Sequence, residues 1–265
     1  MSYSLDHLVI LVYDLERAQA DYTSLGFTVV EGGRHADGLT HNALVAFEDG
    51  TYLELIAFLE EPPDEHPFYR AHGEEGLVTF ALLPREMERD VKEARKRGLE
   101  LQGPRGGGRQ RPDGVRVEWQ TARPGTPDLP FLCADLTRRD LRVPFGPARL
   151  HSNGIAGVAA VTVVVSDLRK SSEHYQALLG AAPLPHGPYN NADSSSFQVG
   201  GYIITLVQPE GGEMRDYLER RGEGPYAITL LAGKGRSLEE IDQSLAHGVE
   251  LDIVPQGSDI LGTLL

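Results

Sequence analysis

The chain has 265 residues, long enough for two ordinary domains, and its 40 % hydrophobic and 24 % charged residues are typical of a globular protein. A formal net charge of −14 argues against nucleic acid or an anionic membrane as partner, because both are polyanions. The single cysteine, Cys133, excludes an internal disulfide and a cysteine-rich zinc site. No signal-peptide pattern or membrane-length apolar run is visible, so we expect a cytoplasmic protein that binds a small molecule.

Residues 3–58 predict one strand, one helix and three further strands. The first strand candidate, residues 5–13, is almost wholly apolar, as expected of a strand covered on both faces. A helix follows Asp14, which is a typical N-cap residue. Asp49 and Gly50 predict a two-residue hairpin turn, because both residue types tolerate positive φ. The helix is expected over 15–25 and the later strands over 27–31, 41–47 and 51–58.

The same order of elements recurs along the chain, which matters more than any single motif. A second copy has a strand at 76–83, a helix at 85–97 and strands at 99–101, 115–121 and 130–135. A third copy has a strand at 157–165, a helix at 166–179 and a hairpin around Gly200 and Gly201. A fourth, shorter copy has a strand at 226–231, a helix after Ser237 and strands at 251–254 and near 260–265.

These repeats predict an α+β fold of four βαβββ modules with curved mixed sheets, arranged in two domains. The first domain spans 1–143, with modules at 3–58 and 76–136, and the second spans 144–265, with modules at 157–209 and 224–265. Residues 137–153 are the linker candidate. Residues 106–111, Gly-Gly-Gly-Arg-Gln-Arg, fall between predicted strands, so we expect a mobile rim loop that could close over an anionic substrate.

Four βαβββ modules are the architecture of the vicinal oxygen chelate superfamily, and particular residues resemble its glyoxalase-like domain proteins. They are Leu5-Asp6-His7, Thr40-His41-Asn42, the strand from Asp49 to Phe58, the stretch from Leu129 to Asp135, and His151-Ser-Asn-Gly. The resemblance covers essentially the whole chain and implies two glyoxalase-like domains. It leaves the activity open, because the superfamily includes lyases, isomerases, epimerases, dioxygenases and non-catalytic drug-binding proteins.

The resemblance also implies a metal site inside a cup that paired modules form, with ligands on the first and fourth strands of each module. In the first module these places hold His7 and Glu54, and each interrupts a nearly apolar strand. A buried carboxylate is costly unless it is paired or bound to metal. Imidazole with carboxylate suits a divalent ion such as Fe, Mn, Zn or Ni. The alternatives are a His–Glu pair without metal, or a Glu54 that faces solvent.

The second module offers few further ligands. Its first strand has only Thr79, and its fourth has Cys133 and Asp135. A small buried hydrophobe is the favoured interpretation of the cysteine. Since two protein ligands bind a metal poorly, a site without metal stays open as an alternative.

Two strands supply candidate substrate contacts. Arg116 and Glu118 alternate with apolar residues, so their face either lines the cup or meets solvent, while Trp119 packs beneath the helix. Asn42 and Tyr52 are candidate wall residues of the cup.

His41 is the candidate general base. A two-residue turn would place Val45 opposite Glu54 and therefore His41 on the face of Glu54. The alternative is an ordinary surface histidine. His151 is expected to cap, and the other histidines show no ligand spacing; they are His35, His66, His72, His174, His186 and His247.

The third module has Ala160 and Ile204 at the positions that match His7 and Glu54, which predicts a degenerate second domain. The favoured function is a glyoxalase-like metal-dependent lyase or isomerase that acts on a small carbonyl or vicinal-oxygen substrate, with Glu54 or His41 moving a proton. An extradiol-type dioxygenase is the second enzymatic interpretation. A non-catalytic binding protein of the drug-resistance type is the other alternative, and the expected state is a monomer or homodimer.

Overall fold

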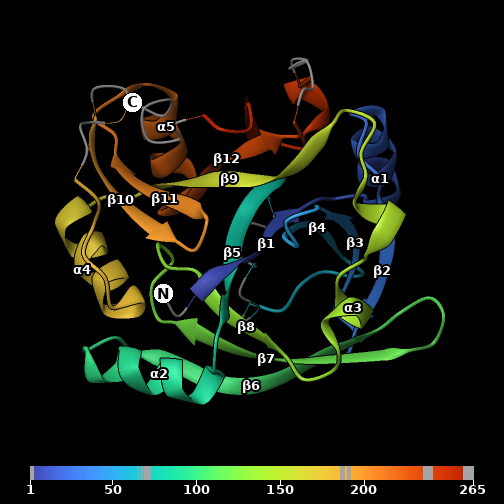
Figure 1. The fold of residues 1–265 in the computed structure, drawn as a ribbon, viewed down its shortest axis with the longest axis horizontal. Coiled ribbons are helices and arrows are strands. Elements are labelled where there is room, and N and C mark those ends of the chain that lie inside the picture. Colours follow the sequence, from blue (N-terminus) through green and yellow to red (C-terminus); the bar gives the residue numbers. More distant parts are fainter. Residues whose placement is uncertain are drawn as a thin grey trace.

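The computed structural model describes residues 3–64, 66, 68, 73–185, 189, 192–234 and 241–258. Within them the chain forms two curved sheets that pack against each other (Figure 1). The first residues of the helix predicted after Ser237, the strand predicted near 260–265, and His72 and His186 lie outside these residues. The described residues that follow in place of that predicted helix form a short 3₁₀ turn at Gln243–Leu245. No helix in the described ranges is long and apolar enough to cross a membrane.

The first two modules close into one barrel with the strand order β1-β4-β3-β2-β6-β7-β8-β5. Within the barrel, β1 runs parallel to β4 and antiparallel to β5, so the first strands of both modules lie side by side. The first module comprises β1 (Tyr3–Leu11), α1 (Leu15–Ser24), β2 (Val30–His35), β3 (Thr40–Ala46) and β4 (Tyr52–Phe58). The second comprises β5 (Gly76–Pro84), α2 (Met87–Lys96), β6 (Leu101–Gln110), β7 (Arg116–Pro124) and β8 (Phe131–Asp135).

The other two modules form a five-stranded sheet with the order β10-β11-β9-β12-β13. Its elements are β9 (Ile155–Val164), α4 (Leu168–Leu179), β10 (Asp193–Val199), β11 (Tyr202–Gln208), α5 (Gly212–Arg221), β12 (Gly224–Ala232) and β13 (Glu250–Val254). As in the barrel, the first strands of the two modules, β9 and β12, pair antiparallel. Helix α5 was not expected from the sequence.

The internal repeat is visible in how corresponding helices begin. The side chains of Asp14 and Asp167 each accept a hydrogen bond, at 3.0 Å, from the backbone N–H three residues later, and so cap α1 and α4. Gly180, with a φ of 66°, ends α4 in the left-handed conformation. The predicted α+β fold of repeated modules is therefore confirmed.

The hairpin between β3 and β4 differs from the predicted one by a single residue. Its loop has three residues, Glu48 to Gly50, because the backbone N–H of Phe47 donates to Thr51 O at 2.9 Å. Gly50 takes a φ of 87°, as a three-residue loop requires at its last position. Leu44, and not Val45, consequently lies opposite Glu54. A one-residue change of register turns every side chain of a strand to the other face.

Two segments predicted to be irregular are ordered. Residues 106–111 were expected to be a mobile loop, but β6 continues to Gln110 and pairs with β7 along most of its length. That prediction was wrong, because Gly107 and Gly108 have no side chains and can therefore lie in the extended strand, close to Trp119 and to the backbone of Val117 respectively. The predicted linker also contains a short helix, α3 (Arg139–Arg142), and a 3₁₀ turn at Gly146–Arg149.

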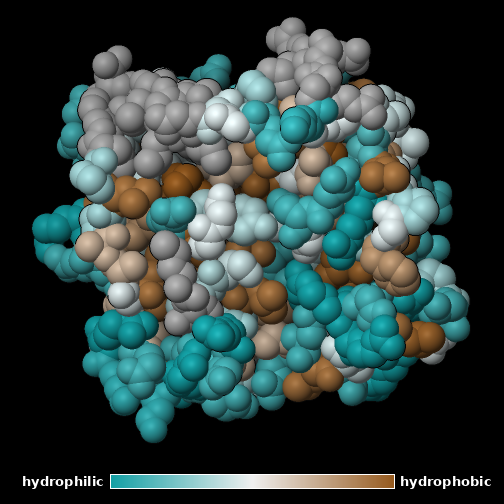
Figure 2. Space-filling model, viewed as in Figure 1, coloured by the Kyte–Doolittle hydropathy of each residue, from teal (hydrophilic) through white to brown (hydrophobic). Residues whose placement is uncertain are grey.

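One buried apolar cluster joins the barrel to the second sheet. It includes Leu8 and Phe80 of the barrel together with Val161 and Ile228 of the second sheet. Figure 2 shows hydrophilic residues over α2, at the lower left of this view, and apolar residues near the middle of the face. The domain boundary at residue 143 stays a prediction.

Ile228→Ala in β12 is expected to lower the free energy of unfolding by about 2–5 kcal/mol, because Ile228 is fully buried and its removal leaves a cavity. Trp119 is the single tryptophan and lies in the barrel, so its fluorescence reports barrel unfolding. If the shared core makes both sheets unfold together, the midpoints of Trp119 fluorescence and far-UV circular dichroism shift equally. A Trp119 midpoint that does not move would contradict this coupling.

Candidate functional site

The inner face of the barrel encloses a cavity of about 720 Å³. Its walls come from both modules, and they combine charged, aromatic and aliphatic side chains. The lining residues used below are His7, Val9, His35, Tyr52, Glu54, Ile56, Phe68, Arg109, Arg116, Glu118, Trp119, Arg123, Phe131, Cys133 and Arg142.

A bulge in β1 places two consecutive polar side chains in contact. Leu5 pairs with Leu82 and His7 with the next residue, Ala81, so Asp6 is the extra residue of β1. His7 Nδ1 lies 2.6 Å from Asp6 Oδ2, and both side chains are buried. A proton on Nδ1 therefore belongs to this hydrogen bond, and Nε2 is left for the cavity.

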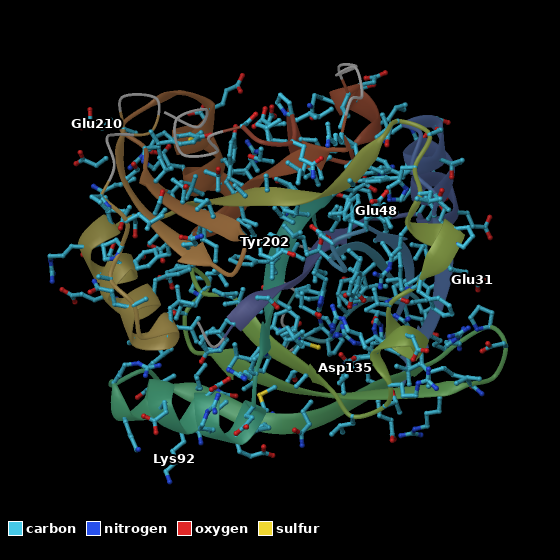
Figure 3. The ribbon with its side chains drawn as sticks, in the orientation of Figure 1. Glu31, Glu48, Lys92, Asp135, Tyr202 and Glu210 are labelled. Atoms are coloured by element: carbon cyan, nitrogen blue, oxygen red, sulfur yellow. The ribbon has the colours of Figure 1, made fainter. Side chains whose placement is uncertain are left out.

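Arginines of α3 neutralise Asp6. Arg142, 2 % exposed, donates from NH1 to Asp6 Oδ2 at 2.8 Å and from NH2 to Asp6 Oδ1 at 3.0 Å. Arg139 adds a bond to Asp6 Oδ1 at 2.6 Å. Burial alone would raise the pKa of Asp6, but Arg142 and His7 outweigh it and hold that pKa well below its usual range. Asp135, labelled in Figure 3, bonds both arginines.

Glu54 is a buried carboxylate with three polar neighbours. Asn42 Nδ2 donates to its Oε1 at 2.6 Å, His35 Nε2 lies 3.5 Å from Oε1, and His7 Nε2 lies 3.4 Å from Oε2. Burial raises its pKa, whereas His35, His7 and Asn42 lower it, and the balance is a pKa of about 2. Glu54 is thus an anion at neutral pH.

Tyr52 completes the wall beside His7. Its ring stacks on the imidazole with 4.7 Å between centroids, and its hydroxyl accepts a bond from Arg142 NH1 at 2.7 Å. Of the site residues predicted from the sequence, the structure brings together His7, Asn42, Tyr52 and Glu54. Their order along β1, β3 and β4 puts them on one continuous inner surface.

Arg116 and Glu118 also border the cavity, but in a different setting. They form an ion pair of 2.9 Å, and their side chains are 71 % and 45 % exposed. Such a pair contributes little to stability and is open to solvent. Trp119 does not pack beneath a helix as predicted, since its ring lines the cavity and meets His35 edge-on at 5.9 Å.

His41 does not lie where the sequence predicted. Because Leu44 is opposite Glu54, His41 points to the other face of β3, together with Ala43 and Val45. His41 does not line the cavity. The prediction that it shares the face of Glu54 was wrong, for the physical reason that the hairpin has one more loop residue than expected.

Two other histidines bear on the site. His35, for which the sequence predicted no role, lies on β2. Its Nδ1 is 2.8 Å from Thr40 Oγ1, and its Nε2 faces Glu54. His151 packs outside the cavity, where its Nδ1 accepts from Thr28 N at 2.9 Å. Asp6 and Arg142 were also missed; the only sequence signal for them was charge inside an apolar strand and inside an apparent linker.

The residues present do not fit the metal arrangement that the superfamily implies. His7, His35 and Glu54 have the residue types of a two-histidine, one-carboxylate set. The two imidazoles, however, face different oxygens of Glu54, and no group of three or more His, Cys, Asp or Glu among the described residues is arranged to hold an ion. On β5 and β8, which adjoin β1 in the barrel, the second module presents Ala81, Phe131 and Cys133, where further ligands would have to lie.

Cys133 matches its favoured interpretation. It is buried in an apolar cluster, and burial raises the pKa of its thiol to about 12. The thiol is therefore neutral at physiological pH, because burial outweighs the nearby Arg142, and it lacks the thiolate that a cysteine nucleophile needs.

The second sheet has no counterpart of this site. Register shows that Thr162 and Thr205 pair as Val9 and Glu54 do, so Thr205 and not Ile204 corresponds to Glu54. Its hydroxyl is 2.8 Å from Ser196 Oγ. The second domain is degenerate with either assignment, because neither Ala160 nor Thr205 carries an imidazole or a carboxylate.

The buried charge of Glu54 makes stability depend on pH. Its pKa is about 2 when folded, below the ordinary 4.5, so its contribution is full above pH 4.5 and is lost as pH falls toward 2. We expect wild-type unfolding free energy to drop more steeply over this interval than that of Glu54→Gln, by up to about 3 kcal/mol. Denaturant titrations at a series of pH values measure this. Glu118→Gln, at the exposed rim, is expected to keep the wild-type slope, and equal slopes for wild type and Glu54→Gln would contradict the assignment.

Known proteins agree with this architecture. Solved structures that resemble the chain include a hypothetical protein from Staphylococcus aureus, at a TM-score of 0.76 and 13 % identity, over 96 % of this chain and 99 % of that one. A mutant of 4-hydroxymandelate synthase from Streptomyces coelicolor has a TM-score of 0.62 and 18 % identity, over 87 % and 71 %. A xylose isomerase-like TIM barrel/4-hydroxyphenylpyruvate dioxygenase fusion protein has 0.55 and 18 %, over 88 % and 37 %.

At these identities the likeness concerns the fold alone. No curated protein matches the chain. The model of the glyoxalase-like domain matches residues 5–179, which include the whole barrel and the first strand and helix of the second sheet. On this match, the chain belongs to the glyoxalase-like domain family of the vicinal oxygen chelate superfamily.

Proposed function

We propose that the barrel cavity is the active site of an enzyme that moves a proton on a small carbonyl compound, as an isomerase or a lyase. The observation that carries the proposal is the chain Asp6–His7–Glu54: an imidazole held at 2.6 Å by one buried carboxylate and facing a second at 3.4 Å, in the wall of a cavity. An oriented imidazole is the commonest general acid–base group.

Asp6 has the positioning role in this proposal. Because Arg142 keeps Asp6 ionised, the carboxylate accepts the Nδ1 proton of His7 and fixes the ring orientation. His7 Nε2 then exchanges a proton with a substrate carbon or oxygen. Glu54, an anion in the same wall, stabilises the imidazolium that forms when His7 takes up the proton.

Tyr52 is suited to the oxygen of the carbonyl group. Its hydroxyl oxygen accepts a bond from Arg142, and no acceptor for its own proton occurs among the described residues. That proton is available to a substrate oxygen on which negative charge develops, and the cation behind the hydroxyl strengthens the donor. The arrangement uses residues of β1 and β4, which pair directly.

A non-catalytic binding function is the second candidate. It is favoured by the apolar part of the cavity lining, where Val9, Ile56, Phe68 and Phe131 form a cluster suited to holding a ligand without chemistry. The structural likeness to 4-hydroxymandelate synthase suggests a dioxygenase as a further candidate. A dioxygenase reaction needs a metal site, which the arrangement of donors among the described residues does not provide.

His7→Ala is expected to reduce proton transfer by about 10²–10⁴-fold, the usual contribution of a general acid–base group. The measurement is deuterium incorporation, by proton NMR in D₂O, at the α-carbon of a panel of 2-oxo acids, α-hydroxyketones and methylglyoxal. His41→Ala is the matched control, because His41 lies on the other face of the sheet and should leave the rate unchanged. Absence of exchange by wild type on every member of the panel, with and without added divalent ions, favours the binding function instead.

The metal content of the purified protein tests the donor arrangement separately. We expect less than stoichiometric Fe, Mn, Zn, Ni or Co by elemental analysis, both as purified and after reloading and desalting, with the same values for His7→Ala and His35→Ala. One tightly held ion per chain, lost in either variant, would mean that the side chains rearrange around a metal. Proton transfer without metal would then be abandoned in favour of the metal-dependent enzyme that the sequence suggested.

A further inference from the structure

Arg123 is a charged residue of the cavity that the proposed proton transfer does not use. It belongs to β7, it is half-buried, and its guanidinium carbon lies 4.4 Å from the centroid of the Phe131 ring. No carboxylate or hydrogen-bond acceptor for it occurs among the described residues. A guanidinium held over an aromatic face does not use its N–H donors in that contact, so they stay free for a ligand.

The other arginines of the cavity are mostly neutralised. Arg142 binds Asp6 and Asp135, and Arg116 binds Glu118. Arg109 donates to the backbone oxygen of Arg142 at 2.7 Å but has no carboxylate partner, and its buried Nε has no acceptor within the described residues. Within the described part of the chain, two guanidiniums of the cavity thus lack a carboxylate partner, although the formal net charge of the protein is −14.

Such cations are unusual in a buried site. Burial lowers the pKa of both Arg109 and Arg123, because removing a cation from water without a charged partner costs free energy. A folded protein that keeps this cost inside a cavity has a site that an anion would complete. Arg123 is the better placed of the two, because its neighbours include both the apolar wall and the residues of the proton-transfer chain.

Distances connect Arg123 to His7. The guanidinium of Arg123 lies over the Phe131 ring, and the same ring contacts the His7 imidazole edge-on, with 5.4 Å between the ring centroids. Strand register agrees, since Ala81 pairs with both His7 and Phe131. Arg123 and His7 therefore contact the same ring, so that one small molecule lying along Phe131 can reach both.

We propose that Arg123 binds the carboxylate of the substrate, and that the substrate is a small carboxylic acid with an apolar or aromatic body. Val9, Ile56 and Phe68 pack against the body, while Arg123 fixes the charged end. Arg109 supplies positive potential from β6. The reacting end of this substrate class rests on the proposed proton transfer, whereas the binding of the carboxylate does not.

Isothermal titration with phenylacetate and its uncharged analogue phenylacetamide tests the assignment. Wild type is expected to bind phenylacetate at least about tenfold more tightly than the amide, because the charge-assisted bonds to Arg123 are lost with the amide. Arg123→Gln should remove this preference, and Arg123→Lys should keep part of it. Arg169→Gln on α4, which removes an exposed arginine outside the cavity that is paired with Glu173, should keep all of it.

Each outcome decides one of the two proposals. Equal binding of phenylacetate and phenylacetamide by wild type, or an unchanged preference in Arg123→Gln, overturns the carboxylate assignment. If Arg123→Gln does not fold, as judged by circular dichroism, Arg123→Met replaces it as the uncharged variant, and an unchanged preference in Arg123→Met overturns the assignment. His7→Ala is the separating variant: retained preference without proton exchange supports the Arg123 assignment and leaves the reaction to be judged by the exchange experiment alone.

Discussion

The buried ion pair between Asp6 and Arg142 is the interaction on which the site depends. Both side chains are nearly inaccessible to water, at 0 % and 2 % exposure, so neither charge tolerates loss of the other. Asp6 is available for the pair because a bulge in β1 inserts it beside His7. Arg142 is available because the segment after β8 folds into α3 and returns to the barrel (Figure 1). One contact therefore orients the imidazole, polarises Tyr52 and fixes the connection between the two sheets.

Most of the fold could be predicted because it is repeated. The cap residues Asp14 and Asp167, followed by similar helices, are local signals, and local signals survive in the folded state. The residues His7 and Glu54 could be predicted for a related reason: a polar side chain in an apolar strand is buried and therefore needs a hydrogen-bonding or charged partner. Strand lengths were less accessible. The glycine run of β6 was predicted as a loop because the sequence does not reveal that Trp119 occupies the space beside Gly107.

The rest of the site depends on geometry that a sequence expresses only weakly. One extra loop residue in the β3–β4 hairpin exchanged His41 for Asn42 and Thr40 on the inner face. His35 reaches Glu54 from β2, a strand whose place in the barrel is set by closure and not by any pattern in its own residues. Arg142 comes from 136 residues further along the chain than its partner Asp6, and no spacing rule predicts such a contact.

The barrel explains why a strongly acidic chain can hold uncompensated arginines. Closure of two modules removes open strand edges and leaves an interior surface that meets little solvent, so interactions between charges are stronger there than on the exterior. Glu54 stays ionised only because His7, His35 and Asn42 surround it. Arg123 has no hydrogen-bonded carboxylate among the described residues and lies over an aromatic face instead. The charged groups of the cavity therefore differ in kind. Glu54 is surrounded by its partners, whereas the donors of Arg123 have no partner in the part of the chain that the structure describes, and this difference is the reason for proposing that a ligand anion binds there.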